Sequence, residues 1–217
     1  MKKGCILCLL ISVISLPLIA QNIIYSNLKE LLTQHGDTTA VLRVEKRSRN
    51  QIVLTGGADY RITAGDDESM CRRLKKRCFA VRDEKGNLYL NCRKLRYKKL
   101  RFGAWYAPAV QLGKNIYFCA MPLGSVIGGN FVEEDDVKLG GNIGDALAAS
   151  SLVTKRVCYE LNGETGKVDF LGKDRMLQLL KNYPELKQAY LKDDSQEAKH
   201  TFKYLLELQN KQKKYFQ

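Results

Sequence analysis

"CFAVRDEKGNLYLNC" (residues 78–92) contains two short runs of alternating apolar and polar side chains around a Lys-Gly-Asn turn (residues 85–87). Alternation with a period of two is typical of β-strands, and a short glycine-containing segment between two such runs predicts a β-hairpin. A loop over residues 84–86 gives a register in which Cys78 lies opposite Cys92. Two alternatives then remain open for this pair: a disulfide, or two small buried apolar side chains.

Segments of similar texture on both sides extend the hairpin to an antiparallel sheet. Short β-branched runs at residues 39–46, 50–57 and 58–65, separated by polar or glycine-containing breaks, predict two or three antiparallel strands. An almost uncharged run at residues 114–124 predicts a central strand. Residues 154–172 predict a second hairpin, whose turn runs from Asn162 to Gly166.

Helical periodicity occurs at both ends of the chain and once within it. Residues 26–36 predict a short amphipathic helix with Ser26 as N-cap and Gly36 at the C-terminal cap. Residues 66–78 begin with acidic and end with basic side chains, as the helix dipole favours. Residues 173–217 predict three helices that dock on the sheet through Leu177, Leu180, Phe202, Leu205 and Leu206.

The predicted fold class is therefore α+β, with an antiparallel β-sheet core, a short N-terminal helix and a helical C-terminal tail. Three parts follow along the chain: a signal peptide over residues 1–20, a mainly antiparallel β domain over residues 21–172, and a helical segment over residues 173–217 that packs on this domain.

The first twenty residues predict export. Two lysines precede an apolar run from residue 5 to residue 18, and Ala20 offers a cleavage site. A retained membrane anchor is the alternative, but the run is shorter than the roughly 20 residues that span a bilayer. No cysteine stands at the cleavage point, so a lipoprotein is not expected. We expect a soluble mature protein without a transmembrane segment, in the periplasm or outside the cell.

The chain is basic, with 36 lysine and arginine residues against 23 aspartate and glutamate residues and a net charge of +13. Outside the cytoplasm such a surface meets anionic glycans, lipopolysaccharide or envelope proteins. Five cysteines lie beyond the signal peptide, and in an oxidising compartment an odd number leaves at least one unpaired. Their spacings do not match a zinc site, so neither a metal nor a cofactor is predicted.

The hairpin leads into "NCRKLRYKKLRFGAWYAPA" (residues 91–109), which concentrates positive charge. Apolar and basic side chains alternate there, and the doubled lysine predicts a bulge or tight bend. Two interpretations remain: a surface that binds a polyanion, or the solvated face of an ordinary strand. Export disfavours a third, nucleic acid. The candidate polyanion-binding residues are Arg93, Lys94, Arg96, Lys98, Lys99 and Arg101.

No catalytic motif is recognisable. The chain lacks H-E-x-x-H, "PLGSVIG" around Ser125 does not match G-x-S-x-G, and the glycine-rich residues 124–151 do not form a phosphate-binding motif. The acidic run at residues 133–136 lacks the alternate spacing of a calcium loop. The predicted function is a non-catalytic envelope binding or structural protein with a basic face. The alternative is an enzyme with an unconventional cysteine-based site, beside His35 or His200.

The basic stretch at residues 91–109, continuing into "IYFCAMPLGS", resembles an uncharacterised family of exported proteins from Bacteroides-type gut bacteria. The close match covers residues 78–125. The export signal ending in "AQ" and the tail "LLKNYPELKQAYLKD" are similar in style to envelope proteins of that group. The resemblance implies an envelope location and supplies no activity, substrate or catalytic residue.

Overall fold

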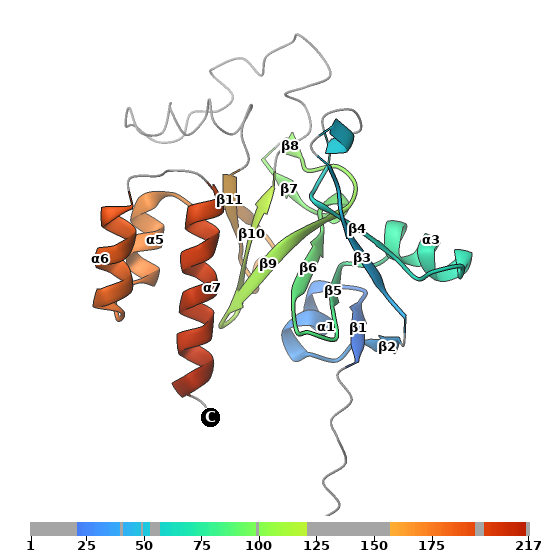
Figure 1. Cartoon of the computed structure of the whole chain (residues 1–217), viewed down its shortest axis with the longest axis horizontal. Coiled ribbons are helices and arrows are strands. Elements are labelled where there is room, and N and C mark those ends of the chain that lie inside the picture. Colours follow the sequence, from blue (N-terminus) through green and yellow to red (C-terminus); the bar gives the residue numbers. More distant parts are fainter. Residues whose placement is uncertain are drawn as a thin grey trace, which may run out of the picture.

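The structure, a computed structural model, describes residues 21–39, 41–48, 50–52, 57–98, 100–120, 157–193 and 198–215. Within them, ten strands form one antiparallel sheet in the order β12-β11-β10-β9-β6-β5-β1-β2, and the β3–β4 hairpin joins it through β9 (Figure 1). Strands and helices together confirm the α+β class. The strands of this sheet are β1 (Asn22–Tyr25), β2 (Asp37–Thr39), β3 (Arg43–Lys46), β4 (Tyr60–Thr63), β5 (Ala80–Arg82), β6 (Leu88–Asn91), β9 (Tyr106–Leu112), β10 (Asn115–Ala120), β11 (Val157–Leu161) and β12 (Val168–Phe170).

The hairpin predicted at residues 78–92 is confirmed, and so is its register. β5 pairs with β6 so that Ala80 lies opposite Leu90 and Arg82 opposite Leu88. The turn is closed by the Asp83 amide, which donates to the Asn87 carbonyl at 2.9 Å. Local alternation and turn chemistry were sufficient to place this element.

Cys78 and Cys92 do not form a disulfide, which corrects the first of the two alternatives. The chain leaves β6 at Asn91 and enters a single 3₁₀ turn, η1 (Cys92–Lys94). Cys78 packs in a buried cluster with Leu74, whereas Cys92 packs in a different one. Both cysteines are buried, as the second alternative predicted.

β9 is the central strand of the sheet, and the sequence did not predict it. β9 pairs with β10 along one edge and with β6 along the other, and it also pairs with β4 through Tyr106 and Tyr60. β10, predicted from residues 114–124, has five buried residues out of six. The second predicted hairpin is formed by β11 and β12 around the Asn162 turn, whose side-chain oxygen accepts from the Glu164 and Thr165 amides at 2.9 Å.

Three C-terminal helices cover one face of the sheet beside β9, β10 and β11 (Figure 1). They are α5 (Lys173–Leu179), α6 (Pro184–Lys192) and α7 (Ala198–Tyr215). Leu180 and Leu205 are fully buried, as expected, while Leu177 and Phe202 are half-buried. Leu206 is 41% exposed, so its predicted burial is wrong. Tyr204 and Leu208 are buried in its place, because the buried side of α7 is rotated from the expected one, and Tyr204 packs against Tyr190 of α6.

Two further helices lie on the other side of the molecule. α1 (Leu28–Thr33) has Asn27 as its N-cap, one residue after the predicted Ser26, and ends at Gln34 instead of Gly36. α3 (Glu68–Lys76) has Asp67 as its N-cap and lies within the predicted range. Buried Asn91 donates to the carbonyls of Leu74 and Cys78 at 3.1 and 2.9 Å, which satisfies groups that a helix end leaves unpaired.

One predicted strand is corrected and one predicted region is not covered. Residues 50–52 are helical, although residues 50–57 were expected to form a strand. The glycine-rich and acidic segments at residues 124–151 lie outside the described residues. Among the described residues, no helix has both the length and the apolar character needed to cross a membrane.

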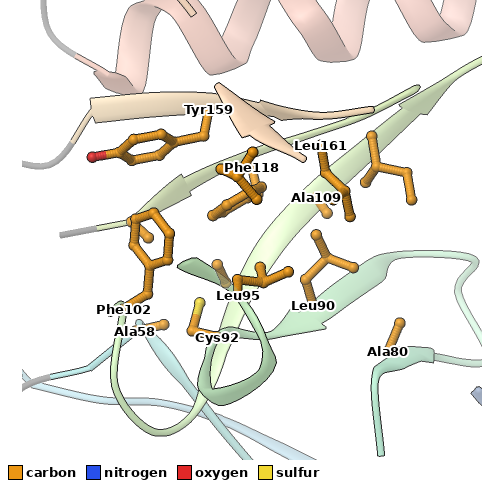
Figure 2. Close-up of a cluster of buried hydrophobic side chains, with 14 of the residues drawn as sticks. Ala58, Ala80, Leu90, Cys92, Leu95, Phe102, Ala109, Phe118, Tyr159 and Leu161 are labelled. Atoms are coloured by element: carbon orange, nitrogen blue, oxygen red, sulfur yellow. The ribbon is translucent and has the colours of Figure 1, made fainter. Parts of the chain in front are cut away.

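The main core lies between the sheet and the segment that connects β6 to β9. Phe102, Phe118 and Tyr159 meet there, with ring centroids 4.7 to 5.5 Å apart (Figure 2). Leu95 packs into the same cluster from the basic stretch. The apolar side chains of that stretch therefore belong to the core, and the alternating basic side chains point to solvent.

Candidate anion-binding surface

A two-stranded hairpin displays the charges of the basic stretch. β7 (Arg96–Tyr97) pairs with β8 (Leu100–Arg101), so that Arg96 lies directly opposite Arg101. Lys98 begins the turn with φ at 51°, which confirms the tight bend expected at the doubled lysine. Lys99 lies outside the described residues.

Alternation divides this segment into a buried and an exposed side, as the sequence predicted. Leu95, Tyr97 and Phe102 are at most 3% exposed and belong to the main core. The exposed residues are the described members of the predicted set, which we call the basic surface: Arg93, Lys94, Arg96, Lys98 and Arg101. The structure thus places these five side chains on η1 and the β7–β8 hairpin.

The basic surface is not neutralised by the carboxylates that the structure describes. None of its five residues takes part in an ion pair with a described aspartate or glutamate. Like charges directly opposite each other on an antiparallel pair destabilise it, and Arg96 and Arg101 are such a pair. An anion bound between them would relieve this repulsion.

A second basic group, at the end of α3, adjoins η1. Lys75, Lys76 and Arg77 are exposed there, just before Cys78. Asn91 donates to the Cys78 carbonyl and accepts from the Arg93 amide at 3.2 Å, so it links the end of α3 to the start of η1. The sequence placed these two basic groups on separate elements and did not predict the link through Asn91.

Trp105 lies between η1 and the β3–β4 hairpin. Its carbonyl accepts from the Cys92 amide at 2.9 Å. The guanidinium carbons of Arg47 and Arg61 each lie 5.5 Å from the centroid of its ring. Burial lowers the pKa of Arg47, and the nearby charge of Asp59 partly offsets this effect. The sequence did not indicate this group, because its members come from distant segments.

The ion pair between Arg175 and Glu160 has a structural role. Arg175 on α5 donates through Nε and one terminal nitrogen to both oxygens of Glu160 on β11, each at 2.8 Å. Tyr117 and Asn115 donate to the same carboxylate at 3.0 and 2.6 Å. Burial alone would raise the pKa of Glu160, but the hydrogen bonds and charge of Arg175 hold it below its ordinary value. The Arg175 bonds hold α5 on β11, and the Asn115 and Tyr117 bonds join β10 to β11.

Cys119 and Cys158 form a disulfide that the sequence did not predict. They lie opposite each other in the β10–β11 register, with their Cα atoms 4.1 Å apart. Both are buried beneath the start of α7, where their sulfurs lie 3.6 and 3.4 Å from the Ala198 carbonyl oxygen. The spacing of 39 residues gave no signal, because the intervening length says nothing about strand register.

The geometry does not favour the cysteine-based enzyme. His35 Nδ1 lies 2.6 Å from the Thr33 carbonyl, and His200 Nδ1 lies 2.9 Å from Asp193, so within the described part of the chain neither Nδ1 is paired with a cysteine. Burial raises the pKa of Cys78 to about 11, which keeps it as an unreactive thiol. Among the described residues, no group of three or more side chains could hold a metal ion.

Fold and surface together define an α+β protein with an antiparallel sheet and a basic hairpin. The chain belongs to DUF6563, a family of unknown function whose model matches residues 23–212. Comparisons with curated proteins and with solved structures found no significant match.

Proposed function

We propose that the protein is an exported, non-catalytic binding protein whose basic surface holds an anionic saccharide, either an acidic glycan or phosphorylated lipopolysaccharide. The carrying observation is the opposition of Arg96 and Arg101 without a described carboxylate partner. The β7–β8 register sets Arg96 directly opposite Arg101 beside the buried apolar core, so an anion bound between the two arginines would offset their mutual repulsion. Bidentate pairing with sulfate, phosphate or carboxylate suits arginine.

Three observations support export. The Cys119–Cys158 disulfide suits an oxidising compartment, because disulfides are rare where thiols are kept reduced. The first strand starts at Asn22, just after the predicted cleavage at Ala20. The charged and apolar pattern of residues 1–20 is that of a secretory signal. Amino-terminal sequencing of the secreted or periplasmic protein tests this part, and a start at Gln21 is expected.

The binding proposal is tested by titrating the mature protein with heparin and with lipopolysaccharide at two salt concentrations. Binding should weaken strongly as salt rises from about 0.1 M to 1 M, because the Debye length falls from about 10 Å to about 3 Å. Replacing Arg96, Lys98 and Arg101 together by Gln should lower affinity at least tenfold. The melting temperature should change little, because exposed charges contribute only about 0–1 kcal/mol each.

A matched control removes the same charge elsewhere. Lys192, Lys199 and Lys213 are exposed on α6 and α7, and replacing them by Gln should leave affinity nearly unchanged. Equal losses in both triple variants would support the rival interpretation, in which the strand face is merely solvated and attraction depends on net charge alone.

A further inference from the structure

Trp105 is the only tryptophan of the chain, and its backbone has an unusual conformation. Its φ of 80° lies in a region that bulky L-residues seldom adopt. Two hydrogen bonds hold it there: Ala58 N–H donates to the Ala104 carbonyl at 3.0 Å, and Cys92 N–H donates to the Trp105 carbonyl. Such strained residues persist where the surroundings impose them, and they cluster at ligand sites.

The two guanidinium groups beside the indole differ in how they are held. Arg47 is only 8% exposed and donates to the carbonyls of Ala58 and Gln51 at 2.7 and 2.9 Å, so it is part of the fold. Arg61 on β4 is exposed. Contact with the indole orients the Arg61 guanidinium, since a cation over an aromatic face is attracted to it.

The Arg61 guanidinium and the Trp105 indole N–H remain available to a ligand in the described structure. Glu45 lies opposite Arg61 in the β3–β4 register, yet no ion pair joins Arg61 to any described carboxylate. Within the same described residues, the Trp105 indole N–H has no hydrogen-bond acceptor. A planar guanidinium held in place loses little freedom when it binds an oxyanion, which favours affinity.

We propose that Arg61 and Trp105 form a second, oriented site for an oxyanion group (sulfate, carboxylate or phosphate) of the anionic saccharide. The identity of the ligand rests on the proposed function, while the site itself rests on the geometry around Trp105. The site adjoins the basic surface, because the Cys92 amide that bonds to Trp105 immediately precedes Arg93. Arg61 supplies a directional contact that diffuse charge on the hairpin does not.

Trp105 fluorescence tests this site directly, because no other tryptophan contributes to the emission. The probes are a sulfated heparin tetrasaccharide, an oligogalacturonate and the phosphorylated lipid A disaccharide without acyl chains. A saturable change in emission with any of them supports the site, and their ranking identifies the oxyanion. Absence of a change with all three overturns it.

The decisive variant is Arg61→Lys, which keeps the charge and removes the planar fork. Affinity for the responding probe should fall at least fivefold. Arg43→Lys is the matched control. Arg43 lies two residues from Glu45 on β3 and therefore on the same face as Arg61, but it is not one of the two arginines beside the Trp105 ring. The Arg43→Lys variant should bind the probe with wild-type affinity. An Arg61→Lys variant that folds normally by circular dichroism and binds like wild type would overturn the proposal.

Calorimetry with heparin separates the two proposals. In one outcome, heparin binding depends on salt and is lost when Arg96, Lys98 and Arg101 are replaced, while Trp105 emission stays unchanged. This outcome would refute the Arg61–Trp105 site and leave the proposed function standing. Emission that responds to a probe in both the wild type and the Gln triple variant with equal affinity would support this site and refute the role of the basic surface.

Discussion

Tyr159 has one part that stabilises the fold, its aromatic ring, and one part that destabilises it, its buried hydroxyl. Its ring contacts Phe102, Phe118 and Tyr97 in the main core. Its hydroxyl is buried and has no hydrogen-bond partner among the residues that the structure describes. Burial, and to a smaller degree the neighbouring Tyr97, raises the pKa of this hydroxyl far above its ordinary value. An unpaired buried hydroxyl carries a desolvation penalty that no bond offsets.

Replacing Tyr159 by Phe should therefore leave stability unchanged or raise it by up to about 1 kcal/mol, because the change removes only the unpaired group. Tyr106→Phe is the matched control, because the Tyr106 hydroxyl donates to the Leu74 carbonyl at 2.8 Å in the core. That variant should lose about 1–2 kcal/mol. Urea unfolding measures both. A larger loss for Tyr159→Phe than for Tyr106→Phe would contradict the assignment.

The ion pair between α5 and β11 joins two elements of the structure. Glu160 has a lowered pKa in the folded protein, so its contribution to stability is complete above the unfolded value of 4.5 and is lost as pH falls through the folded value. Glu160→Gln should lower stability at pH 7 by about 2 kcal/mol, a typical size for hydrogen bonds to charged groups. The difference from wild type should shrink as pH falls below 4.5 and through the lower folded-state pKa.

Thermal unfolding across this pH range measures the effect. Glu164→Gln is the control, because the Lys114–Glu164 pair at 2.8 Å is fully exposed and solvent screens it. This control should change the melting temperature much less at every pH. A Glu160→Gln deficit that stays constant from pH 7 to pH 3 would rule out the charged carboxylate as its source.

The Cys119–Cys158 disulfide also acts on elements, since it joins β10 to β11 beneath α7. Closing a loop with a sequence separation of 39 reduces the entropy of the unfolded chain, which corresponds to about 4 kcal/mol of stability. Replacing both cysteines by Ala should lower the urea midpoint accordingly, and dithiothreitol should do the same to wild type. Dithiothreitol should not affect the double variant. An unchanged midpoint in reduced wild type would contradict a stabilising role.

At the scale of the whole molecule, the sheet depends on its three C-terminal helices. Val110, Leu112 and Tyr117 are buried in one cluster with Met176, Leu205 and other residues of these helices. Truncation after Gly172 should expose this apolar face and cause aggregation, measured by light scattering. A truncated protein that stays monomeric with an unchanged melting point would disprove the dependence.

A pair of neighbouring substitutions tests the same packing without deleting a helix. Leu205 is fully buried, whereas Leu206 is 41% exposed. Leu205→Ala should lose about 2–5 kcal/mol. Leu206→Ala should change stability by only about 0.5 kcal/mol. Equal losses would mean that α7 packs on the sheet with a different face.

The sequence alone predicted those features that depend on residues close together in the chain. The register of the β5–β6 hairpin, the turn at Asn162, α3 and the division of the basic stretch into a buried and an exposed side all follow from local alternation, caps and turns. Five of the six candidate site residues could be placed on the surface for this reason.

Only the tertiary structure decided what depends on strand order and on contacts between distant segments. β9 was missed because its alanines and Pro108 are weak strand formers, and its pairing with β6 and β10 is what holds it extended. Cys119 meets Cys158 through the β10–β11 register, and Trp105 meets Arg47 and Arg61 through the β3–β4 hairpin. Such contacts arise when the whole core is buried at once, so no short stretch of sequence encodes them by itself.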